Sequence, residues 1–457
     1  MKIDAFVAEI GSTTTVVSAF DGLHTNTPRF LGQGMAQTSV LSGDVTIGLQ
    51  EAIAQLQQSF SGDLLEPISI YATSSAAGGL KMSVHGLVYD MTVKAAKEAA
   101  LGAGGNVSWV TSGLLSDEDL KQYLHHSLNM ILIAGGVDYG ESKTALENAR
   151  NIASLSLPVP VVYAGNIVNH AAVKAIFHEK GLSSYLSIAP NVYPKIDQLE
   201  VDEVRLLIQN AFEKHITEAP GMEKIRQIIT NKVIPTPGAV MKATQLAATF
   251  MSDVLCIDVG GATSDVHSVS EGTIEIQAIQ TAPEPVSKRT VEGDIGIYIN
   301  KDTCVSLLGK SKLATACNMS LDRLEELLAS YPPIPSGEFI PIAQELTKVA
   351  VHTSISRHVG KRFVTYSQQG KITLASGKDL SAIQSIICTG GALVKLPNPI
   401  EMVKEAWKKL DPLALLPKEV PDIYIDQYYI MAAIGVLVED FPIGATALLK
   451  HTLKGGR

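Results

Sequence analysis

Ile257-Asp258-Val259-Gly260-Gly261-Ala262-Thr263-Ser264-Asp265-Val266 is the stretch that decides the fold. The apolar run Val254–Ile257 leads into an acid, and two glycines and small hydroxyl residues follow. This pattern predicts a strand that ends in a tight turn and returns as a second strand. Because the turn carries nothing bulky, its backbone amides can close on an anion, and Asp258 stands where a carboxylate can hold a water or a metal ion.

The same pattern occurs at the N-terminus, in Phe6-Val7-Ala8-Glu9-Ile10-Gly11-Ser12-Thr13-Thr14-Thr15-Val16-Val17. Aligning Glu9 with Asp258 also aligns Gly11 with Gly260 and Thr14 with Thr263. We interpret the match as an internal duplication. It predicts two loops, each with an acid followed by glycine and hydroxyl residues. The two loops are expected to face each other across a cleft and to bind a polyphosphate from both sides.

Composition is that of a folded protein. The chain has 457 residues, of which 46% are hydrophobic and 18% are charged, and this length predicts about two to four domains. The net charge of -9 argues against a nucleic-acid surface but not against ATP, whose phosphates are met by backbone amides and a metal ion. The N-terminal run contains Asp4 and Glu9, unlike a signal peptide, and the apolar run Ile430–Val438 is too short to span a bilayer. We therefore expect a cytoplasmic protein that binds neither nucleic acid nor membrane.

Hydrophobic periodicity divides the chain into three parts. Residues 1–105 read as three strands, a helix, a strand and a helix, and together with 232–250 they are expected to form the first domain. Residues 106–231 alternate single strands and helices, which predicts an inserted doubly wound domain with a parallel sheet. Residues 251–457 are expected to form the second domain, helical from about 286 to 358 and with a helical insertion at about 300–383.

The inserted part contains one further glycine pair, Gly135-Gly136, at the end of an apolar run. A strand-to-helix turn of this kind can bind phosphate. The segment lacks the full spacing of a dinucleotide fingerprint, which favours a structural turn or a protein-docking role.

The order of the motifs resembles the actin, Hsp70 and sugar-kinase ATPase superfamily. Glu9–Thr15 and Asp258–Asp265 are similar to its two phosphate motifs, and Thr389-Gly390-Gly391-Ala392 is similar to its adenosine motif. Residues 237–243 and 431–435 resemble the two small-residue helices that cross at its hinge. The resemblance implies an α/β fold of two duplicated ribonuclease H-like domains around a nucleotide cleft.

Several further stretches narrow the resemblance. They are Ser74-Ser75-Ala76-Ala77-Gly78-Gly79-Leu80-Lys81-Met82, Ile133–Asp138, Val161–Asn166, Arg289–Gly296 and Arg357–Gly360. Together they are similar to the GlmL family, also called MutL, the accessory proteins of methylaspartate (glutamate) mutase, which are unrelated to the mismatch-repair protein of that name. The resemblance implies an ATP-binding, chaperone-like factor that reactivates or protects an adenosylcobalamin-dependent mutase, either glutamate mutase or a related aminomutase.

The resemblance also implies a site for ATP or ADP with Mg²⁺. Glu9 and Asp258 would hold Mg²⁺ through water, as suits a cation that gives up its hydration reluctantly, and Asp258 would be the catalytic carboxylate. The remaining residues expected to contact the nucleotide are Gly11, Ser12, Thr13, Thr14, Gly260, Gly261, Ala262, Thr263, Gly390, Gly391 and Ala392.

Two departures from the superfamily pattern bear on catalysis. Glu9 stands where Asp is usual, and the stretch Val233–Pro237 has no acid where Hsp70-like members place a glutamate near the attacking water. Asp258 is then the carboxylate left to position that water, with Glu292 and Asp294 as outside candidates. We therefore expect slow hydrolysis.

Three other functions stay open on this fold. A small-molecule kinase acting on an acid or a sugar is the main alternative, although it needs a general base aimed at its substrate and only Asp90 offers itself in residues 70–105. An activator of a radical dehydratase would need cysteines after the glycine loops, whereas Cys256 and Cys388 precede them. A filament-forming protein is the third.

Overall fold

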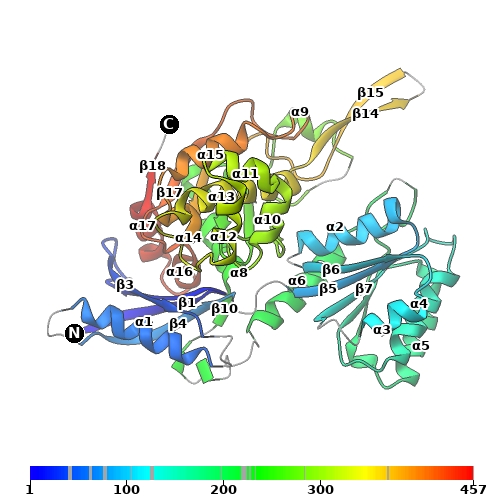
Figure 1. Cartoon of the computed structure of the whole chain (residues 1–457), viewed down its shortest axis with the longest axis horizontal. Coiled ribbons are helices and arrows are strands. Elements are labelled where there is room, and N and C mark those ends of the chain that lie inside the picture. The colour runs from blue at the N-terminus through cyan, green and yellow to red at the C-terminus, as the bar shows by residue number, and fades with distance from the viewer. Residues whose placement is uncertain are drawn as a thin grey trace. The chain divides into compact units, whose positions relative to one another are not determined.

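The computed structural model describes residues 1–39, 44–60, 64–75, 80–103, 105–123, 128–196, 198–217, 224–225, 228–231, 233–281, 284–367 and 370–455. These residues form two compact units. Unit 1 comprises Met1–Gly78, Ile216–Thr290 and Ile295–Arg457, and unit 2 comprises Gly79–His215 and Val291–Asp294. Figure 1 shows the secondary structure of both.

The first sheet of unit 1 has the strand order β10-β4-β1-β2-β3. Its strands are β1 (Lys2–Ile10), β2 (Thr14–Asp21), β3 (Arg29–Gln37), β4 (Glu66–Ser74) and β10 (Val233–Pro235). β1, β2 and β3 form an antiparallel meander, and β4 runs parallel to β1 and to β10. Helix α1 (Thr46–Gln58) packs on this sheet through Leu49, Ala52 and Leu56.

The second sheet of unit 1 repeats this topology, in the order β13-β12-β11-β16-β17-β18. Its strands are β11 (Val254–Val259), β12 (Ser264–Val269), β13 (Ser287–Glu292), β16 (Ser385–Thr389), β17 (Asp422–Asp426) and β18 (Leu453–Gly455). β11 pairs antiparallel with β12 and parallel with β16, as β1 does with β2 and β4. The structure therefore confirms the duplication predicted from the two loops.

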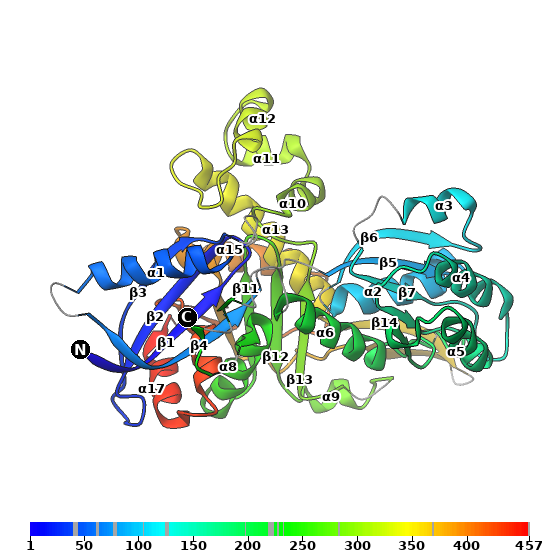
Figure 2. The same ribbon diagram turned by 90° about the horizontal axis from the view of Figure 1, so that it is seen from below.

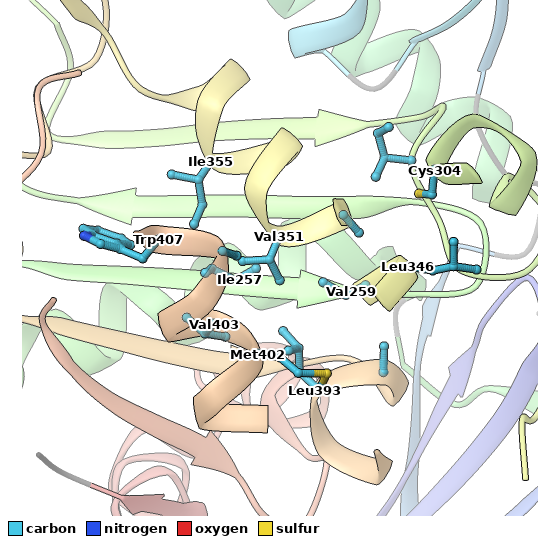
Figure 3. Close-up of a cluster of buried hydrophobic side chains, with 14 of the residues drawn as sticks. Ile257, Val259, Cys304, Leu346, Val351, Ile355, Leu393, Met402, Val403 and Trp407 are labelled. Atoms are coloured by element: carbon cyan, nitrogen blue, oxygen red, sulfur yellow. The ribbon is translucent and has the colours of Figure 1, made fainter. Parts of the chain in front are cut away.

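Three helices pack on the second sheet: α13 (Phe339–His358), α14 (Gly391–Lys395) and α15 (Pro399–Trp407). Of three further helices, α10 (Lys301–Leu308) and α11 (Lys310–Ala316) pack on α13, and α12 (Leu321–Ala329) packs on α11. Figure 3 shows Val351 and Ile355 of α13 beside Ile257 of β11, in one buried cluster with Trp407 of α15. Figure 2 shows α10, α11 and α12 grouped beyond α13.

Small residues let two helices cross closely in a core that both sheets share. α8 (Thr236–Met251) and α16 (Met431–Leu437) pack against each other, and their cluster includes Val7 of β1 and Val254 of β11. A Cβ atom on Gly435 would overlap the carbonyl oxygen of Ala239. The two small-residue helices predicted from the sequence therefore do cross, backbone against backbone. α17 (Pro442–Thr452) follows α16 and packs on it.

Unit 2 is built on a parallel sheet with the order β6-β5-β7-β8-β9. The strands are β5 (Leu80–Gly86), β6 (Gly105–Ser112), β7 (Met130–Ile133), β8 (Val161–Tyr163) and β9 (Leu186–Ile188). The helices are α2 (Lys94–Gly102), α3 (Asp117–Gln122), α4 (Lys143–Ser154), α5 (His170–Glu179) and α6 (Asp202–Thr217), with short helical turns at Tyr89–Val93, Ile167–Asn169 and Ser183–Tyr185. This is the doubly wound arrangement expected of the insertion.

The boundaries of the insertion differ from the predicted 106–231. β5 pairs in parallel with β6 and β7 rather than with the first sheet, and α2 packs on β5 and β6, so residues 80–103 belong to unit 2. At the other end, Ile225 and Ile229 pack in the core of the first sheet, so this segment belongs to unit 1. Residues 76–79 of the Ser74–Met82 marker and Gly104 of the predicted boundary lie outside the described residues.

The predicted helical region beginning at 286 is wrong at its start. Residues 287–292 form strand β13, whose polar side chains Lys288, Thr290 and Glu292 are buried and so hide the apolar alternation expected of a strand. After α13, β14 (Lys361–Ser367) and β15 (Gly370–Ser376) form a hairpin within the span expected to be helical. A short helix, α9 (Ile274–Gln277), precedes β13.

In the part of the chain that is described, no helix is long and apolar enough to cross a membrane.

Candidate functional site

Two equivalent turns define the site. Gly11 N donates to Thr14 O after β1, and Gly260 N donates to Thr263 O after β11, each at 2.9 Å. A Cβ atom would lie 2.8 Å from the same oxygen at Gly11 and 3.1 Å at Gly260, so both positions favour glycine. Each turn leaves its acid, Glu9 or Asp258, one residue before the end of the strand.

The two turns meet inside unit 1. The hydroxyl of Thr13 lies so close to Gly261 that a Cβ atom at residue 261 would overlap it. The loops that the sequence predicts to face each other therefore do so, and the absence of a side chain at Gly261 sets how closely they approach.

This contact gives a prediction that a double-mutant cycle can test. Gly261→Ala should force the loops apart and destabilise the protein, by about 1–3 kcal/mol for overpacking of this kind. Thr13→Ala removes the opposing hydroxyl, so the double variant should recover most of that loss, as measured by urea unfolding of the two single variants, the double variant and the wild type. Additive losses would mean that the two loops are not in contact.

The backbone amides of the second loop point away from the segment 297–300, which supports the loop by hydrogen bonds. Ile297 N donates to Gly260 O (3.2 Å), Tyr298 N to Gly261 O (2.9 Å), and Asn300 Nδ2 to Ala262 O (2.6 Å). Since C=O and N–H point in opposite directions in a trans peptide, the amides of the residues that follow these carbonyls point to the other side of the loop. Oriented amides of this kind form an anion-binding concavity.

A cluster of carboxyl groups lies beside the loops: Asp426 is fully buried, and Glu9 and Asp258 are half-buried. Tyr429 donates its hydroxyl to Glu9 Oε1 at 2.7 Å, which joins the first sheet to the segment after β17. Asp426, the last residue of β17, accepts from Met431 N (2.8 Å) and from the hydroxyl of Thr389 (3.0 Å). Asp258 Oδ1 lies against Gly390, where a Cβ atom would overlap it.

Burial shifts the pKa values of these groups strongly. Desolvation raises the pKa of Glu9 to about 8; the hydrogen bond from Tyr429 opposes this shift, and the charges of Asp258 and Asp426 add to it. Desolvation and the nearby Asp426 raise the pKa of Asp258 to about 7, and burial likewise raises the pKa of Asp426. Without a cation the cluster therefore holds protons at neutral pH.

These raised pKa values predict how the stability of the ligand-free protein depends on pH. The usual pKa values are 4.5 for Glu9 and 3.8 for Asp258, so the folded chain binds more protons than the unfolded chain up to about pH 8. The stabilisation is complete below pH 4 and is lost as pH rises to 8, at about 1.4 kcal/mol for each unit by which the folded and unfolded pKa values differ. Urea unfolding should show a smaller decline for Glu9→Gln and Asp258→Asn; an unchanged decline would contradict the assignment.

The loops and carboxyl groups enclose a cavity of about 220 Å³. Every residue predicted to touch nucleotide or metal lines it except Gly390: Glu9, Gly11, Ser12, Thr13, Thr14, Asp258, Gly260, Gly261, Ala262, Thr263, Gly391 and Ala392. Gly390, with φ at +86°, instead lets the end of β16 lie against Asp258 and Val259. Neither outside candidate, Glu292 or Asp294, is among the described residues that line the cavity.

Several lining residues were not predicted. Asp265 lies opposite Asp258 in the β11–β12 register, Thr236 begins α8, Lys395 ends α14, and Tyr429 follows β17. The rule that ligands bind at the carboxyl ends of parallel strands points to Asp426 and Tyr429, which lie at and just after the end of β17. The segment Pro333–Pro335 between α12 and α13 also lines the cavity.

The residues present fit a nucleotide bound with a divalent cation. The hydroxyl oxygens of Thr13 and Thr236 are buried without a hydrogen-bond partner among the described residues, and oriented amides face the same cavity. Glu9 and Asp258 supply carboxylate oxygens of the kind that hold a hydrated Mg²⁺ through water. Among the described residues, no group of three or more acids, histidines or cysteines is placed to coordinate a metal ion directly. Since only Lys395 brings a cationic side chain to the described lining, Glu9 and Asp258 would repel a polyphosphate that arrived without a cation.

This duplicated sheet, with a glycine turn after the first strand of each half and two crossing helices between the halves, defines the α/β fold of the actin-like ATPase superfamily. The chain belongs to the MutL protein family, whose sequence profile matches residues 5–453.

Individual relatives span almost the whole chain. The chain is 34% identical over 471 residues to the protein named MutL from Clostridium tetanomorphum, covering 99% of both. Among solved structures, it is similar to component A of (R)-2-hydroxyglutaryl-CoA dehydratase from Acidaminococcus fermentans, with 10% identity, 97% and 99% of the two chains covered and a TM-score of 0.32. Ligand-bound xylulose kinase from Lactobacillus acidophilus has 9% identity, with 99% and 93% covered and a TM-score of 0.33.

Proposed function

We propose that this protein binds ATP or ADP with Mg²⁺ between its two glycine turns and acts as an ATP-dependent accessory factor of an adenosylcobalamin-dependent mutase. The observation that carries the nucleotide part is the pair of matched turns, Gly11–Thr14 and Gly260–Thr263, which meet beside Glu9 and Asp258. The partner is inferred from membership of the MutL family.

The roles of the residues follow from their positions. Amides of Ser12 and Thr13 would face the phosphates from one side, and those of Gly261 and Ala262 from the other, with the hydroxyl groups of Thr14 and Thr263 assisting. The amides of Gly11 and Gly260, two residues also expected to contact the nucleotide, donate to Thr14 O and Thr263 O within their own turns instead. Glu9 and Asp258 would hold Mg²⁺ through water. Gly391 and Ala392 would line the adenosine side, supported by Gly390. Mg²⁺, when bound, supplies positive charge that offsets both the phosphates and the carboxylates.

Nucleotide entry requires the halves of unit 1 to separate. The cavity of about 220 Å³ is smaller than the roughly 300–1,000 Å³ of pockets that enclose drug-sized ligands. The crossing of α8 and α16 supplies a narrow pivot of small residues. Binding and release of nucleotide would then be coupled to domain opening and closing, which is the motion an accessory factor can pass to a partner.

Hydrolysis should be slow because few groups can activate water. Asp258 would accept a hydrogen bond from the attacking water and would be the carboxylate that takes its proton. At the start of α8 the chain has Thr236, which lines the cavity but orients water without taking its proton. The site therefore suits a protein whose conformation is controlled by the bound nucleotide better than an enzyme with fast turnover.

One set of assays tests this proposal against a kinase. ATP binding and hydrolysis are measured with the protein alone, with candidate acids and sugars, and with a cobalamin-inactivated mutase. We expect slow hydrolysis that the mutase stimulates, and loss of ATP binding when a chelator removes Mg²⁺. A phosphorylated small molecule among the products would reject the accessory role and establish a kinase.

A further inference from the structure

The carboxyl edge of the unit 2 sheet exposes large apolar side chains. All its strand pairs are parallel, so their carboxyl ends meet at one edge. The segment after each strand exposes at least one such residue, and we take one from each: Val88 after β5 (45% exposed), Leu114 after β6 (60%), Tyr139 after β7 (82%), Val168 after β8 (54%) and Ile196 after β9 (71%). We call these five residues the apolar rim.

The rim is unusual because loops at a sheet edge are normally polar. Single exposed apolar residues are common on soluble proteins, but a contiguous apolar patch marks an interaction site. Here an exposed apolar residue follows every strand of the sheet at one edge. Exposed side chains between 45% and 82% indicate a raised surface, which suits a protein partner better than a small ligand.

A polar network joins three of the five rim segments. Asp138 Oδ1 accepts from Ile167 N (2.9 Å) and from Asn191 Nδ2 (3.0 Å), which joins the segments after β7, β8 and β9. Asn166 donates to the carbonyl oxygens of Gly140 and Glu141 at 3.2 Å. A surface that is ordered before binding loses less conformational entropy when a partner docks.

The exposed Tyr139 has a backbone conformation that costs conformational free energy. Its φ of +62° is in the left-handed region, which costs a non-glycine residue about 1–2 kcal/mol. The backbone is held there by a hydrogen bond from Tyr139 N to Asn166 Oδ1 (3.1 Å). Gly135-Gly136 is also structural, since a Cβ atom on Gly136 would overlap the carbonyl oxygen of Glu141. Strain that presents an exposed tyrosine points to a functional contact.

The charges beside the rim describe its partner. The described parts of these segments and the helix starts that follow them carry Asp117, Glu118, Asp119, Asp138, Glu141, Glu200, Asp202 and Glu203, against Lys94, Lys121, Lys143 and Lys195. Helices α3, α4, α5 and α6 begin here, and each N-terminus offsets about half a charge, which still leaves the edge negative. A complementary surface is therefore apolar at its centre and bordered by lysine or arginine.

We propose that the apolar rim of unit 2 is the docking surface for the mutase, through an apolar patch on the mutase bordered by basic residues. This inference rests on the proposed function. It assigns partner binding to unit 2 and nucleotide binding to unit 1, so each can be removed separately.

The test compares a rim variant with a matched control. The rim variant is the full-length protein with three substitutions, Leu114→Ser, Tyr139→Gly and Val168→Ser. Glycine adopts the positive φ at position 139 without strain, so a loss of binding cannot be ascribed to backbone strain. The control is Leu206→Ser, an exposed apolar residue of α6 (55%). Removing three anchors should weaken mutase binding by at least about 100-fold, while the control and ATP binding stay unchanged. Rising ionic strength should weaken wild-type binding.

Each other outcome has a distinct meaning. Wild-type affinity in the rim variant, with wild-type protein binding the mutase, overturns this inference and leaves the proposed function standing. A rim variant that no longer self-associates but still binds the mutase would show that the rim contacts a second copy of this chain. That result would also overturn the inference. If the wild-type protein neither binds the mutase nor responds to it in the ATPase assay, the proposed function fails and the inference fails with it.

Discussion

Replacing Asp258 with asparagine is expected to lower ATP turnover by about 10²–10⁴-fold, the usual contribution of a positioned general base. The carboxylate is the one acid of the second turn expected to receive the water's hydrogen bond, and asparagine cannot take its proton. ATP binding should weaken less, because the amides of both turns and Glu9 remain. Turnover is measured at saturating Mg²⁺ and ATP.

The fold should survive this change. The pKa of Asp258 is raised to about 7, so the ligand-free protein already tolerates a neutral group there, and asparagine removes repulsion with Asp426. The matched control is Asp422→Asn, at the opposite end of the same sheet on β17, which should leave turnover unchanged. Wild-type turnover in Asp258→Asn would remove Asp258 from the mechanism.

Gly435→Ala is expected to destabilise unit 1 by about 1–3 kcal/mol, the usual cost of overpacking. The added methyl group would overlap the carbonyl oxygen of Ala239, and this neighbour is backbone, which cannot rotate away. α8 and α16 must therefore separate. The better helix propensity of alanine, about 1 kcal/mol, offsets only part of the loss.

Urea unfolding with and without Mg-ATP measures this effect. The control is Gly391→Ala, where an added Cβ atom meets nothing within 4 Å, and whose stability without ligand should match the wild type. We also expect ATP to stabilise Gly435→Ala less than the wild type, because the crossing is the pivot about which the halves close. Wild-type stability in Gly435→Ala would show that the helices are not in backbone contact.

The parts of the site that depend on local sequence were predictable. A strand, an acid and a glycine turn lie within ten residues, so both loops could be located and aligned, and Gly11 and Gly260 make the same hydrogen bond in the structure. The crossing of α8 and α16 was predictable for the same reason, since small residues spaced along a helix indicate close packing.

Contacts between distant segments were not predictable in this way. Nothing near Leu80–Gly86 shows that β5 pairs with β6 and β7 rather than with the first sheet. Tyr429 binds Glu9 across a separation of 420 residues, and this contact offers an account of the glutamate at position 9: its longer side chain meets a tyrosine hydroxyl. β13 was missed because its buried face is polar, and burial of Lys288 is compensated by its hydrogen bond to Ser270 O at 2.6 Å.

The central claim is that ATP bound in unit 1 is used to restore a mutase. The most direct measurement is the activity of a cobalamin-inactivated glutamate mutase, or a related aminomutase, after incubation with this protein, free adenosylcobalamin and Mg-ATP. We predict recovery that requires ATP and is lost with Asp258→Asn. Recovery that is equal without ATP, or no recovery although the protein binds the mutase, would contradict the account.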